Sequence, residues 1–350
     1  MGPKERVLNV LSDNPVDKTP VTSFTQVGIV EAMQKVGAPW PEAHSDPNKM
    51  ATLGASLYKL IGLEAIRVPF CLTVEAEAIG CKVDMGKIDR QPSIRAHAFE
   101  SPSEVRIDPG WLDRGRVPVV LKAIELLKEE GLDAPLIVGI TGPFTLSGHL
   151  IGTEKLVRSI KVEPQNIEKL LDTVVEANIS YCAKIAEAGA DIITVNEPTA
   201  SPDLLNPLDF KYLVKPRLQT LANSIKIKKV LHICGSALPI VGDMAACGYD
   251  AISIEDKVDI TKAKEAISKS VGKPSFPRMT FGGPVKVKIA GNVSTAKTLF
   301  MGKPEEVKAE ALQALKAGVD FLAPACGLAP PTPLANVRAM VEARDEFFAR

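Results

Sequence analysis

Four short segments of the same form recur along the chain, and they limit the possible folds more than any other feature. Each one ends a helical pattern with glycine and opens an apolar run with an acidic residue two positions later. The four are Gly62–Glu64, Gly189–Asp191, Gly248–Asp250 and Gly318–Asp320. Glycine tolerates the left-handed conformation in which many helices end. Repeated helix-to-strand joints of this kind predict alternating β and α units with a parallel sheet.

Eight apolar runs rich in β-forming residues alternate with longer helical patterns. We expect strands at residues 20–26, 65–70, 135–141, 191–196, 229–234, 251–255, 286–292 and 321–325. No glycine-rich dinucleotide fingerprint follows the first run, which argues against an open, doubly wound sheet. The predicted fold class is therefore α/β, a closed (β/α)8 TIM barrel. We expect one domain over residues 1–350, with an N-terminal helix at 4–11 and an insertion around 80–111 that covers the barrel mouth.

The charge balance limits the partners of this chain. It has 42 basic and 42 acidic residues, so neither nucleic acid nor an anionic membrane is expected to bind it. Its start is charged, and no apolar stretch approaches the ~18 residues of a membrane span. The six cysteines are scattered rather than spaced as a disulfide framework. These features predict a soluble protein of a reducing cytoplasm. The basic stretch Lys269–Lys288 is expected to be a solvated surface loop.

Two potential metal ligands stand at the end of one predicted strand, in the sequence His232-Ile233-Cys234-Gly235. Side chains alternate along a strand, so His232 and Cys234 are expected on the same side. The C-terminal strand ends hold the working groups of a (β/α)8 barrel. A single His-x-Cys pair on a buried strand is more often core packing, so a metal site needs further ligands.

Two other predicted strand ends supply such ligands. Cys326 follows the last strand, and Glu255 ends the strand next to that of His232. One histidine with two cysteines is a soft donor set suited to tetrahedral Zn²⁺. We therefore predict that His232, Cys234 and Cys326 are firm zinc ligands. Glu255 is the candidate for a labile fourth position, with Asp256 as the alternative. Three firm ligands and one labile position are typical of a catalytic site.

The other cysteines and histidines are given no ligand role. Cys71 ends a predicted strand but is expected to be apolar lining, and Cys182 and Cys247 are expected to pack in the core. The isolated histidines are expected at the surface or in a lid, and they are His44, His97 and His149.

At these residues the sequence resembles the methylcobamide:coenzyme M methyltransferases of methanogens, within the uroporphyrinogen decarboxylase superfamily. The resemblance runs nearly end to end. It is carried by Thr25–Gln26, Trp40–His44, Arg67–Phe70, Arg90–Ser93, Pro198–Ser201, His232–Gly235, Ser253–Glu255 and Cys326–Gly327. The zinc elements are specific, because the decarboxylases of this superfamily need no metal. The methanol-pathway branch is the most similar, and the methylamine branch stays open.

The resemblance implies His232, Cys234 and Cys326 as zinc ligands, with Glu255 as the fourth. It implies methyl transfer from a methylated corrinoid, methyl-Co(III), carried by a partner protein. The acceptor is the thiol of coenzyme M, and the products are methyl-coenzyme M and Co(I). Zn²⁺ would favour the thiolate form of the acceptor, whose ordinary pKa of ~8.5 leaves it mostly neutral at pH 7.

Further side chains are expected to take part. Catalytic roles are expected for Glu255, Asn196 and Glu197, the last standing where the family pattern predicts aspartate. Binding of cofactor or substrate is expected for Gln26, Arg67 and Arg90. The sulfonate of coenzyme M is expected at Arg67, Arg90, Asn196 or backbone amides, and the sequence does not choose among them.

Three other functions stay open at this point. The methyl acceptor could instead be homocysteine or tetrahydrofolate. A metal-free uroporphyrinogen decarboxylase would need several basic groups at the barrel mouth and no thiol pair. A non-catalytic corrinoid-binding chaperone would bind zinc without transferring a methyl group.

Overall fold

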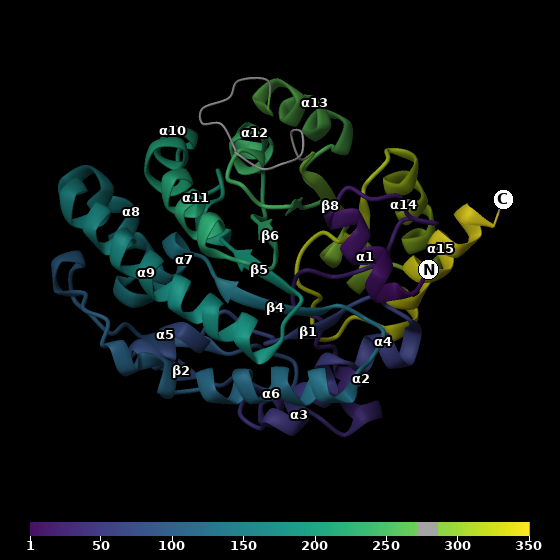
Figure 1. Ribbon diagram of the computed structural model, residues 1–350, viewed down its shortest axis with the longest axis horizontal. Coiled ribbons are helices and arrows are strands. Elements are labelled where there is room, and N and C mark those ends of the chain that lie inside the picture. The colour runs from purple at the N-terminus through teal and green to yellow at the C-terminus, as the bar shows by residue number, and fades with distance from the viewer. Residues whose placement is uncertain (272–285, 350) are drawn as a thin grey trace.

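Seven parallel strands form one sheet in the computed structural model, which describes residues 1–271 and 286–349 (Figure 1). Their order in the sheet is β1-β4-β5-β6-β7-β8-β9. Their bounds are β1 Ile66–Val68, β4 Leu136–Thr141, β5 Ile192–Asn196, β6 Lys228–His232, β7 Ala251–Ser253, β8 Lys288–Val293 and β9 Phe321–Pro324. The residues of β4 and β5 are buried throughout, as expected for parallel strands covered on both faces.

Residues 20–22 close the sheet into a barrel. Val21 forms a parallel bridge with Leu322 of β9. The Val21 carbonyl also accepts a hydrogen bond of 2.8 Å from the backbone N–H of Glu64, just before β1. This segment occupies the place of the predicted first strand, so the predicted (β/α)8 barrel is confirmed. It is shorter than the predicted 20–26 because the chain bends at Phe24 and Thr25.

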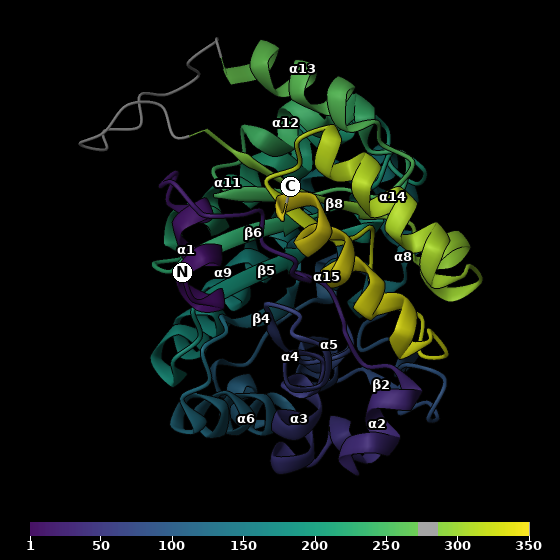
Figure 2. The same ribbon diagram turned by 90° about the vertical axis from the view of Figure 1, so that its right-hand side faces the viewer.

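Helices cover the outside of the barrel. Their bounds are α1 Pro3–Leu11, α2 Val30–Val36, α3 Pro47–Gly54, α4 Ser56–Ile61, α5 Val74–Ile79, α6 Val117–Glu130, α7 Pro143–Ile151, α8 Thr153–Val162, α9 Pro164–Ala188, α10 Pro207–Asp209, α11 Lys215–Ser224, α12 Val241–Ala245, α13 Ile260–Val271, α14 Pro304–Lys316 and α15 Leu334–Phe348. Figure 2 shows α14 and α15 lying across the outer side of the strands. The long helix α9 buries an apolar stripe that includes Ile167, Val174 and Ile185, with the spacing of an amphipathic helix.

The four predicted helix-to-strand joints all have the expected backbone geometry. Their glycines have positive φ angles of 73° at Gly62, 110° at Gly189, 97° at Gly248 and 78° at Gly318. A residue with a Cβ atom adopts this conformation only with strain. The repeated motif therefore marks the points at which the chain reverses direction after a helix and begins a strand parallel to the one before it.

The insertion after β1 contains an antiparallel hairpin. Its strands are β2 Lys82–Asp84 and β3 Ser93–Ala96. In Figure 1 the segments that follow the carboxyl ends of β1, β4 and β5 lie at the left, whereas both termini lie at the right. The predicted surface loop Lys269–Lys288 falls mostly on residues 272–285, which lie outside the described residues.

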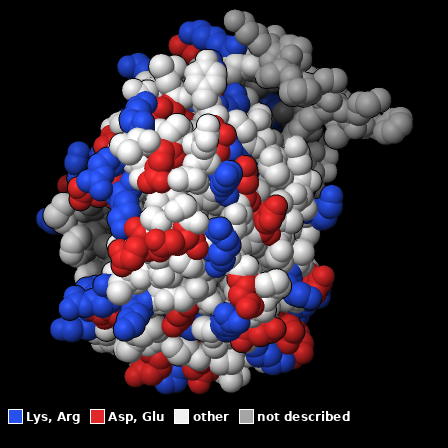
Figure 3. Space-filling view, turned by 90° about the vertical axis from the view of Figure 1, so that its left-hand side faces the viewer, with Lys and Arg blue, Asp and Glu red and all other residues white. Residues whose placement is uncertain are grey.

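The left-hand side of the molecule carries charges of both signs (Figure 3). Lysine and arginine alternate there with aspartate and glutamate around uncharged surface, unlike the basic stripe of a nucleic-acid-binding face. None of the described helices is long and apolar enough to cross a membrane.

A buried ion-pair cluster ties both ends of the chain to the barrel. The Glu64 carboxylate accepts hydrogen bonds from Arg6 of α1 at 2.5 Å and from Arg344 of α15 at 3.1 Å. The three side chains are only 2–4% exposed. Two buried guanidinium groups therefore share one carboxylate.

Replacing Glu64 by glutamine is expected to lower the free energy of unfolding by about 1–3 kcal/mol, because both guanidinium groups lose their shared counter-charge. Arg6 keeps Asp17 and Arg344 keeps Asp345, each at 2.7 Å. Urea unfolding followed by circular dichroism measures the loss. The matched control is Glu125→Gln, which breaks an exposed 2.9 Å pair with Lys122 and should cost less than about 1 kcal/mol. Equal losses in the two variants would contradict the structural importance of the buried cluster.

Candidate metal centre and substrate cavity

His232 and Cys234 lie at the carboxyl end of β6, the position predicted for them. The strand ends at His232, and the chain turns at Gly235 with a φ of 80°. The backbone N–H of Glu197 donates a hydrogen bond of 2.9 Å to the His232 carbonyl, which links the ends of β5 and β6. The rigid strand thus delivers both potential ligands to the barrel mouth.

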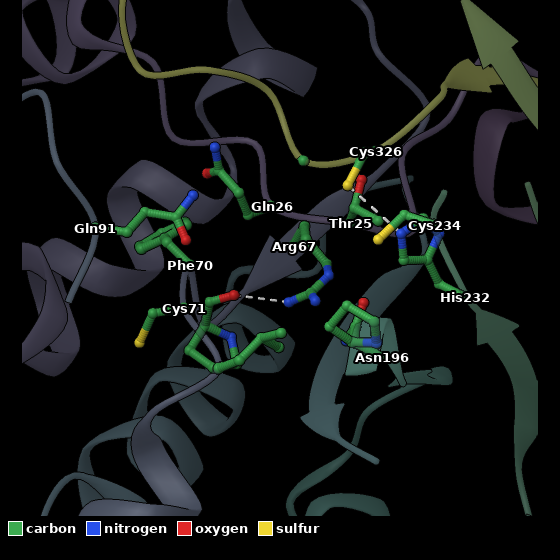
Figure 4. A pocket seen from close by; sticks show the side chains of 14 residues that line it. Thr25, Gln26, Arg67, Phe70, Cys71, Gln91, Asn196, His232, Cys234 and Cys326 are labelled. Carbon is green, nitrogen blue, oxygen red and sulfur yellow. Dashed lines mark hydrogen bonds between the residues drawn. The ribbon is translucent and has the colours of Figure 1, made fainter. Parts of the chain in front are cut away.

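Cys326, just past β9, completes a group of three potential metal ligands. The ligand atoms of His232, Cys234 and Cys326 all lie within 4.8 Å of one another. The distance from Cys326 Sγ to His232 Nε2 is 3.6 Å, although the two residues are 94 positions apart (Figure 4). They meet because the carboxyl ends of the strands in a closed parallel barrel share one rim.

The geometry of this group suits a tetrahedral zinc ion. Zn–S and Zn–N bonds of about 2.3 and 2.0 Å place the two ligand atoms about 3.5 Å apart in a tetrahedron. His232 Nδ1 lies 3.0 Å from the Ser253 hydroxyl, which orients Nε2 toward the two thiols, as a hydrogen-bond partner commonly does for a ligating histidine. A hydrogen bond between the thiols raises the pKa of Cys234 and lowers that of Cys326. The first proton of the pair is therefore lost from Cys326.

Glu255 lies two residues beyond β7 and is half-buried. Its carboxylate accepts a hydrogen bond from the backbone N–H of Gly235, next to Cys234, and it lies outside the compact three-residue group. Asp256 follows it in the chain and is also half-buried. The fourth ligand stays a prediction.

The three potential ligands line a cavity of about 180 Å³ at the barrel mouth. The other residues that line it are Thr25, Gln26, Arg67, Pro69, Phe70, Cys71, Leu72, Gln91, Asn196, Pro198 and Gly327. This volume is below the 300 Å³ or more of a pocket for a drug-sized ligand. The cavity therefore suits a molecule of a few heavy atoms and excludes a tetrapyrrole.

Arg67 of β1 is the one lysine or arginine among the described residues that line the cavity. Its Nε donates to the Phe24 carbonyl at 3.2 Å, and its Nη1 donates to the Val68 and Pro69 carbonyls at 2.6 and 2.7 Å. No carboxylate of the described residues pairs with it, although it is 2% exposed. Burial lowers its pKa to about 9. The guanidinium is thus a buried cation without a carboxylate counter-ion, in the middle of the cavity wall (Figure 4).

The remaining predicted site residues differ in whether they reach the cavity. Gln26 and Asn196 line the cavity, but their amide N–H groups donate to backbone carbonyls, Asn196 to Ile140 at 3.0 Å. Glu197 lies behind the cavity wall, where its carboxylate accepts the backbone N–H groups at the start of α7. Burial raises its pKa to about 7. The structure does not bring Arg90 into the cavity, because it is exposed and paired with Asp84 at 3.0 Å.

Sequence reasoning missed three contributors to this cavity. Gln91, the neighbour of the predicted Arg90, reaches the cavity from the hairpin. Gly139 of β4 leaves room for the Arg67 guanidinium, which a Cβ at this position would strike. Cys71 was expected to be apolar lining, yet its sulfur contacts Arg116. The alternation along strands carries no signal for these contacts, because each joins two distant segments.

Burial also tests the predictions made for Cys182, Cys247 and His44. Cys182 and Cys247 are buried as predicted, and burial raises the pKa of both thiols. The prediction for His44 was wrong, since it is fully buried and packs against Trp40 with ring centroids 4.7 Å apart. An aromatic neighbour four residues earlier was the available signal.

The parallel barrel and the group of His232, Cys234 and Cys326 at its mouth define a barrel protein with a candidate metal centre. The comparison with protein families identifies its family. The uroporphyrinogen decarboxylase model matches residues 2–347, and the chain belongs to this family. Its relatives include methylcobamide:CoM methyltransferase MtaA of Methanosarcina barkeri, 43% identical over 99% of this chain and 98% of the relative. Methylcobamide:CoM methyltransferase MtbA of Methanosarcina mazei is 35% identical over the same shares. A solved methyltransferase from Methanosarcina mazei superposes with a TM-score of 0.92 at 44% identity, covering 99% of both chains.

Proposed function

We propose that this protein transfers a methyl group from a methylated corrinoid, carried by a partner protein, to the thiol of coenzyme M. The products are methyl-coenzyme M and Co(I), in methanogenesis from methanol or methylamines. The observation that carries the proposal is the group of His232, Cys234 and Cys326 in the lining of a small cavity. The full-length similarity to methylcobamide:CoM methyltransferases supports it.

The residues of the group would hold a zinc ion. His232, Cys234 and Cys326 are its proposed ligands, and the Ser253 hydroxyl keeps the imidazole oriented. When bound, zinc supplies Lewis acidity that favours the thiolate form of the acceptor. Glu255 is the proposed fourth ligand, which the substrate thiol would replace.

Arg67 is the proposed partner of the sulfonate. It lies in the cavity wall without a carboxylate counter-ion, whereas Arg90 is exposed and paired with Asp84. An anionic group that enters the cavity would neutralise the charge of a guanidinium that burial has already desolvated. The side-chain N–H of Asn196 already donates to a backbone carbonyl. Its side-chain carbonyl oxygen is left without a hydrogen-bond partner among the described residues. The thiol and the sulfonate of one small molecule would then be held from two sides.

The corrinoid must approach the cavity from outside, because about 180 Å³ cannot hold a tetrapyrrole ring. We propose that residues 1–350 form one domain and that the insertion around 80–111 covers the mouth where the corrinoid arrives. Gln91 in this insertion lines the cavity, which supports the proposal.

The alternative functions have less support. A porphyrinogen with many carboxylates would call for several cations, and the described cavity lining offers Arg67 alone. Homocysteine carries an ammonium group beside its carboxylate, and the described cavity lining holds no carboxylate to accept that ammonium. A chaperone without catalysis gains no support from the similarity to transferases.

Methylcobalamin tests the proposal as methyl donor for the zinc-loaded protein. We expect Co(I) to form, seen by its absorbance, with coenzyme M as acceptor and not with homocysteine or tetrahydrofolate. A chelator that removes the metal should abolish the reaction, and zinc should restore it. Methyl transfer to homocysteine in preference, or full activity in metal-free protein, would overturn the proposal.

Replacing Glu255 by alanine is expected to weaken zinc affinity by about 10- to 100-fold, because the fourth position is left to water. Competition with a chromogenic chelator measures this affinity. Asp256→Ala is the matched control, and it should leave the affinity unchanged. The reverse order of effects would transfer the fourth-ligand role to Asp256.

A further inference from the structure

Cys71 follows β1 and lines the same cavity as the ligand group. In Figure 4 it lies on the far side of Arg67 from His232, Cys234 and Cys326. It therefore plays no part in the proposed metal site. The proposed function also leaves it without a role.

The surroundings of Cys71 are strongly polar. Its sulfur lies 3.3 Å from Arg116 Nη1 and 3.3 Å from the Thr73 hydroxyl. Arg116 is fixed in turn by Glu77 at 2.6 Å and by the Thr73 hydroxyl at 2.7 Å. Arg67, Glu75 and His44 also interact electrostatically with the sulfur. Both ring nitrogens of His44 are buried without a hydrogen-bond partner among the described residues.

Arg116, His44 and Thr73 favour a negative sulfur, whereas the like charge of Glu75 opposes it. Burial opposes ionisation of Cys71, but the Arg116 guanidinium, helped by His44 and Thr73, lowers its pKa to about 5. The other thiols outside the metal group behave in the opposite way. Burial raises the pKa of Cys81 to about 11 and also raises those of Cys182 and Cys247. Thiolates, not thiols, are the nucleophiles in disulfide exchange.

We propose that Cys71 is a covalent capture site for disulfides that carry an anionic tail, in the first place the disulfide form of the proposed acceptor thiol. The inference rests on the proposed function for the identity of that thiol. Arg67, a buried cation of the same cavity without a carboxylate partner, would hold the anionic tail. Arg116 stabilises the attacking sulfur.

The exchange balances without any further oxidant. The Cys71 thiolate attacks one sulfur of the disulfide R–S–S–R, a new S–S bond forms to Cys71, and R–S⁻ leaves. The disulfide supplied is the oxidant, and one of its halves is reduced. The captured half fills part of the acceptor's cavity, so the modified protein is blocked until a free thiol reverses the exchange. An oxidised thiol pool would thus stop methyl transfer.

The test uses full-length, zinc-loaded protein at pH 6, where an ordinary thiol is almost entirely neutral. Methyl transfer is first measured on part of each preparation. The rest is treated with bis(2-sulfonatoethyl) disulfide or with the neutral bis(2-hydroxyethyl) disulfide. Adducts are counted by intact mass and located by peptide mapping. We expect a single adduct on Cys71, formed about tenfold faster or more from the anionic reagent because of the charge-assisted contact.

Three variants and the pH dependence of the exchange rate test the inference further. Cys71→Ser should remove the adduct, Cys182→Ser should keep it, and Arg67→Leu should slow only the anionic reagent. The rate at Cys71 should be half-maximal near pH 5 rather than near the ordinary thiol pKa of about 8.5. Protein that is active in methyl transfer but forms no adduct on Cys71 would overturn this inference alone. Equal rates with both reagents would overturn the preference for anionic disulfides. Inactive starting protein would instead count against the proposed function.

Discussion

Replacing Cys326 by alanine is expected to remove the metal and, with it, methyl transfer. The Cys326 sulfur lies 3.6 Å from His232 Nε2, and without it only two of the three firm ligands remain, both from one strand end. The loss of a thiolate ligand should weaken zinc binding far more than the 10- to 100-fold typical of a supporting residue. Because the metal supplies several kcal/mol of stabilisation to the reacting group, kcat/KM should fall by about a thousandfold or more.

Zinc content per chain, measured by elemental analysis, and the methylcobalamin assay give two independent readouts. Cys247→Ala is the matched control, since this thiol is fully buried away from the group and should keep one zinc per chain. Circular dichroism shows whether the Cys326 variant is folded. A folded Cys326→Ala protein with full zinc content would refute the proposed ligand set.

Replacing Arg67 by leucine is expected to raise KM for coenzyme M by about 100-fold, with a smaller change in kcat. Removing one partner of a buried, hydrogen-bonded charge pair costs about 2–5 kcal/mol, and a factor of 100 corresponds to about 2.7 kcal/mol. The effect should be confined to anionic acceptors. With 2-mercaptoethanol, a neutral thiol, kcat/KM should change by less than about threefold, because no charge contact is lost.

Arg67 also donates to three backbone carbonyls, so a loss of stability must be separated from a loss of binding. Urea unfolding of Arg67→Leu measures the first, and the ratio of coenzyme M to 2-mercaptoethanol activity measures the second. Arg90→Leu is the control, since this exposed side chain pairs with Asp84 and should change neither quantity. An unchanged activity ratio in Arg67→Leu would show that the guanidinium is only structural.

The metal group shows which site residues strand periodicity can predict. The alternation along β6 and the strand-end position of Cys326 predicted three side chains that the structure brings within 4.8 Å of one another. Glu255 lies close to this group through Gly235, but its position as a ligand depends on a side-chain rotation that periodicity does not determine. The role of all four residues as ligands stays a prediction that the variants above address.

The substrate side of the cavity was less accessible to sequence reasoning. Asn196 lines it from the end of β5, whereas Arg67 reaches it from the middle of β1 and Gln26 from the loop after the bend at Phe24 and Thr25. Arg90, chosen for its charge, pairs with Asp84 at the surface of the hairpin, and Gln91 faces the cavity instead. In an exposed hairpin the direction of each side chain depends on how the hairpin packs over the barrel, which its own sequence does not specify.

The sequence by itself determined the closed parallel barrel and the strand ends that meet at its mouth. Both follow from local patterns, namely the glycine joints, the period of two in the strands and the amphipathic helices. Only the tertiary structure decided the electrostatics of the cavity. Among the described residues Arg67 is buried without a carboxylate partner, because Gly139 leaves room for it and three backbone carbonyls accept its hydrogen bonds. Cys71 has a polar environment because Arg116, 45 residues away, packs against it. Charge and pKa depend on contacts between distant segments, and these form only when the whole barrel has packed.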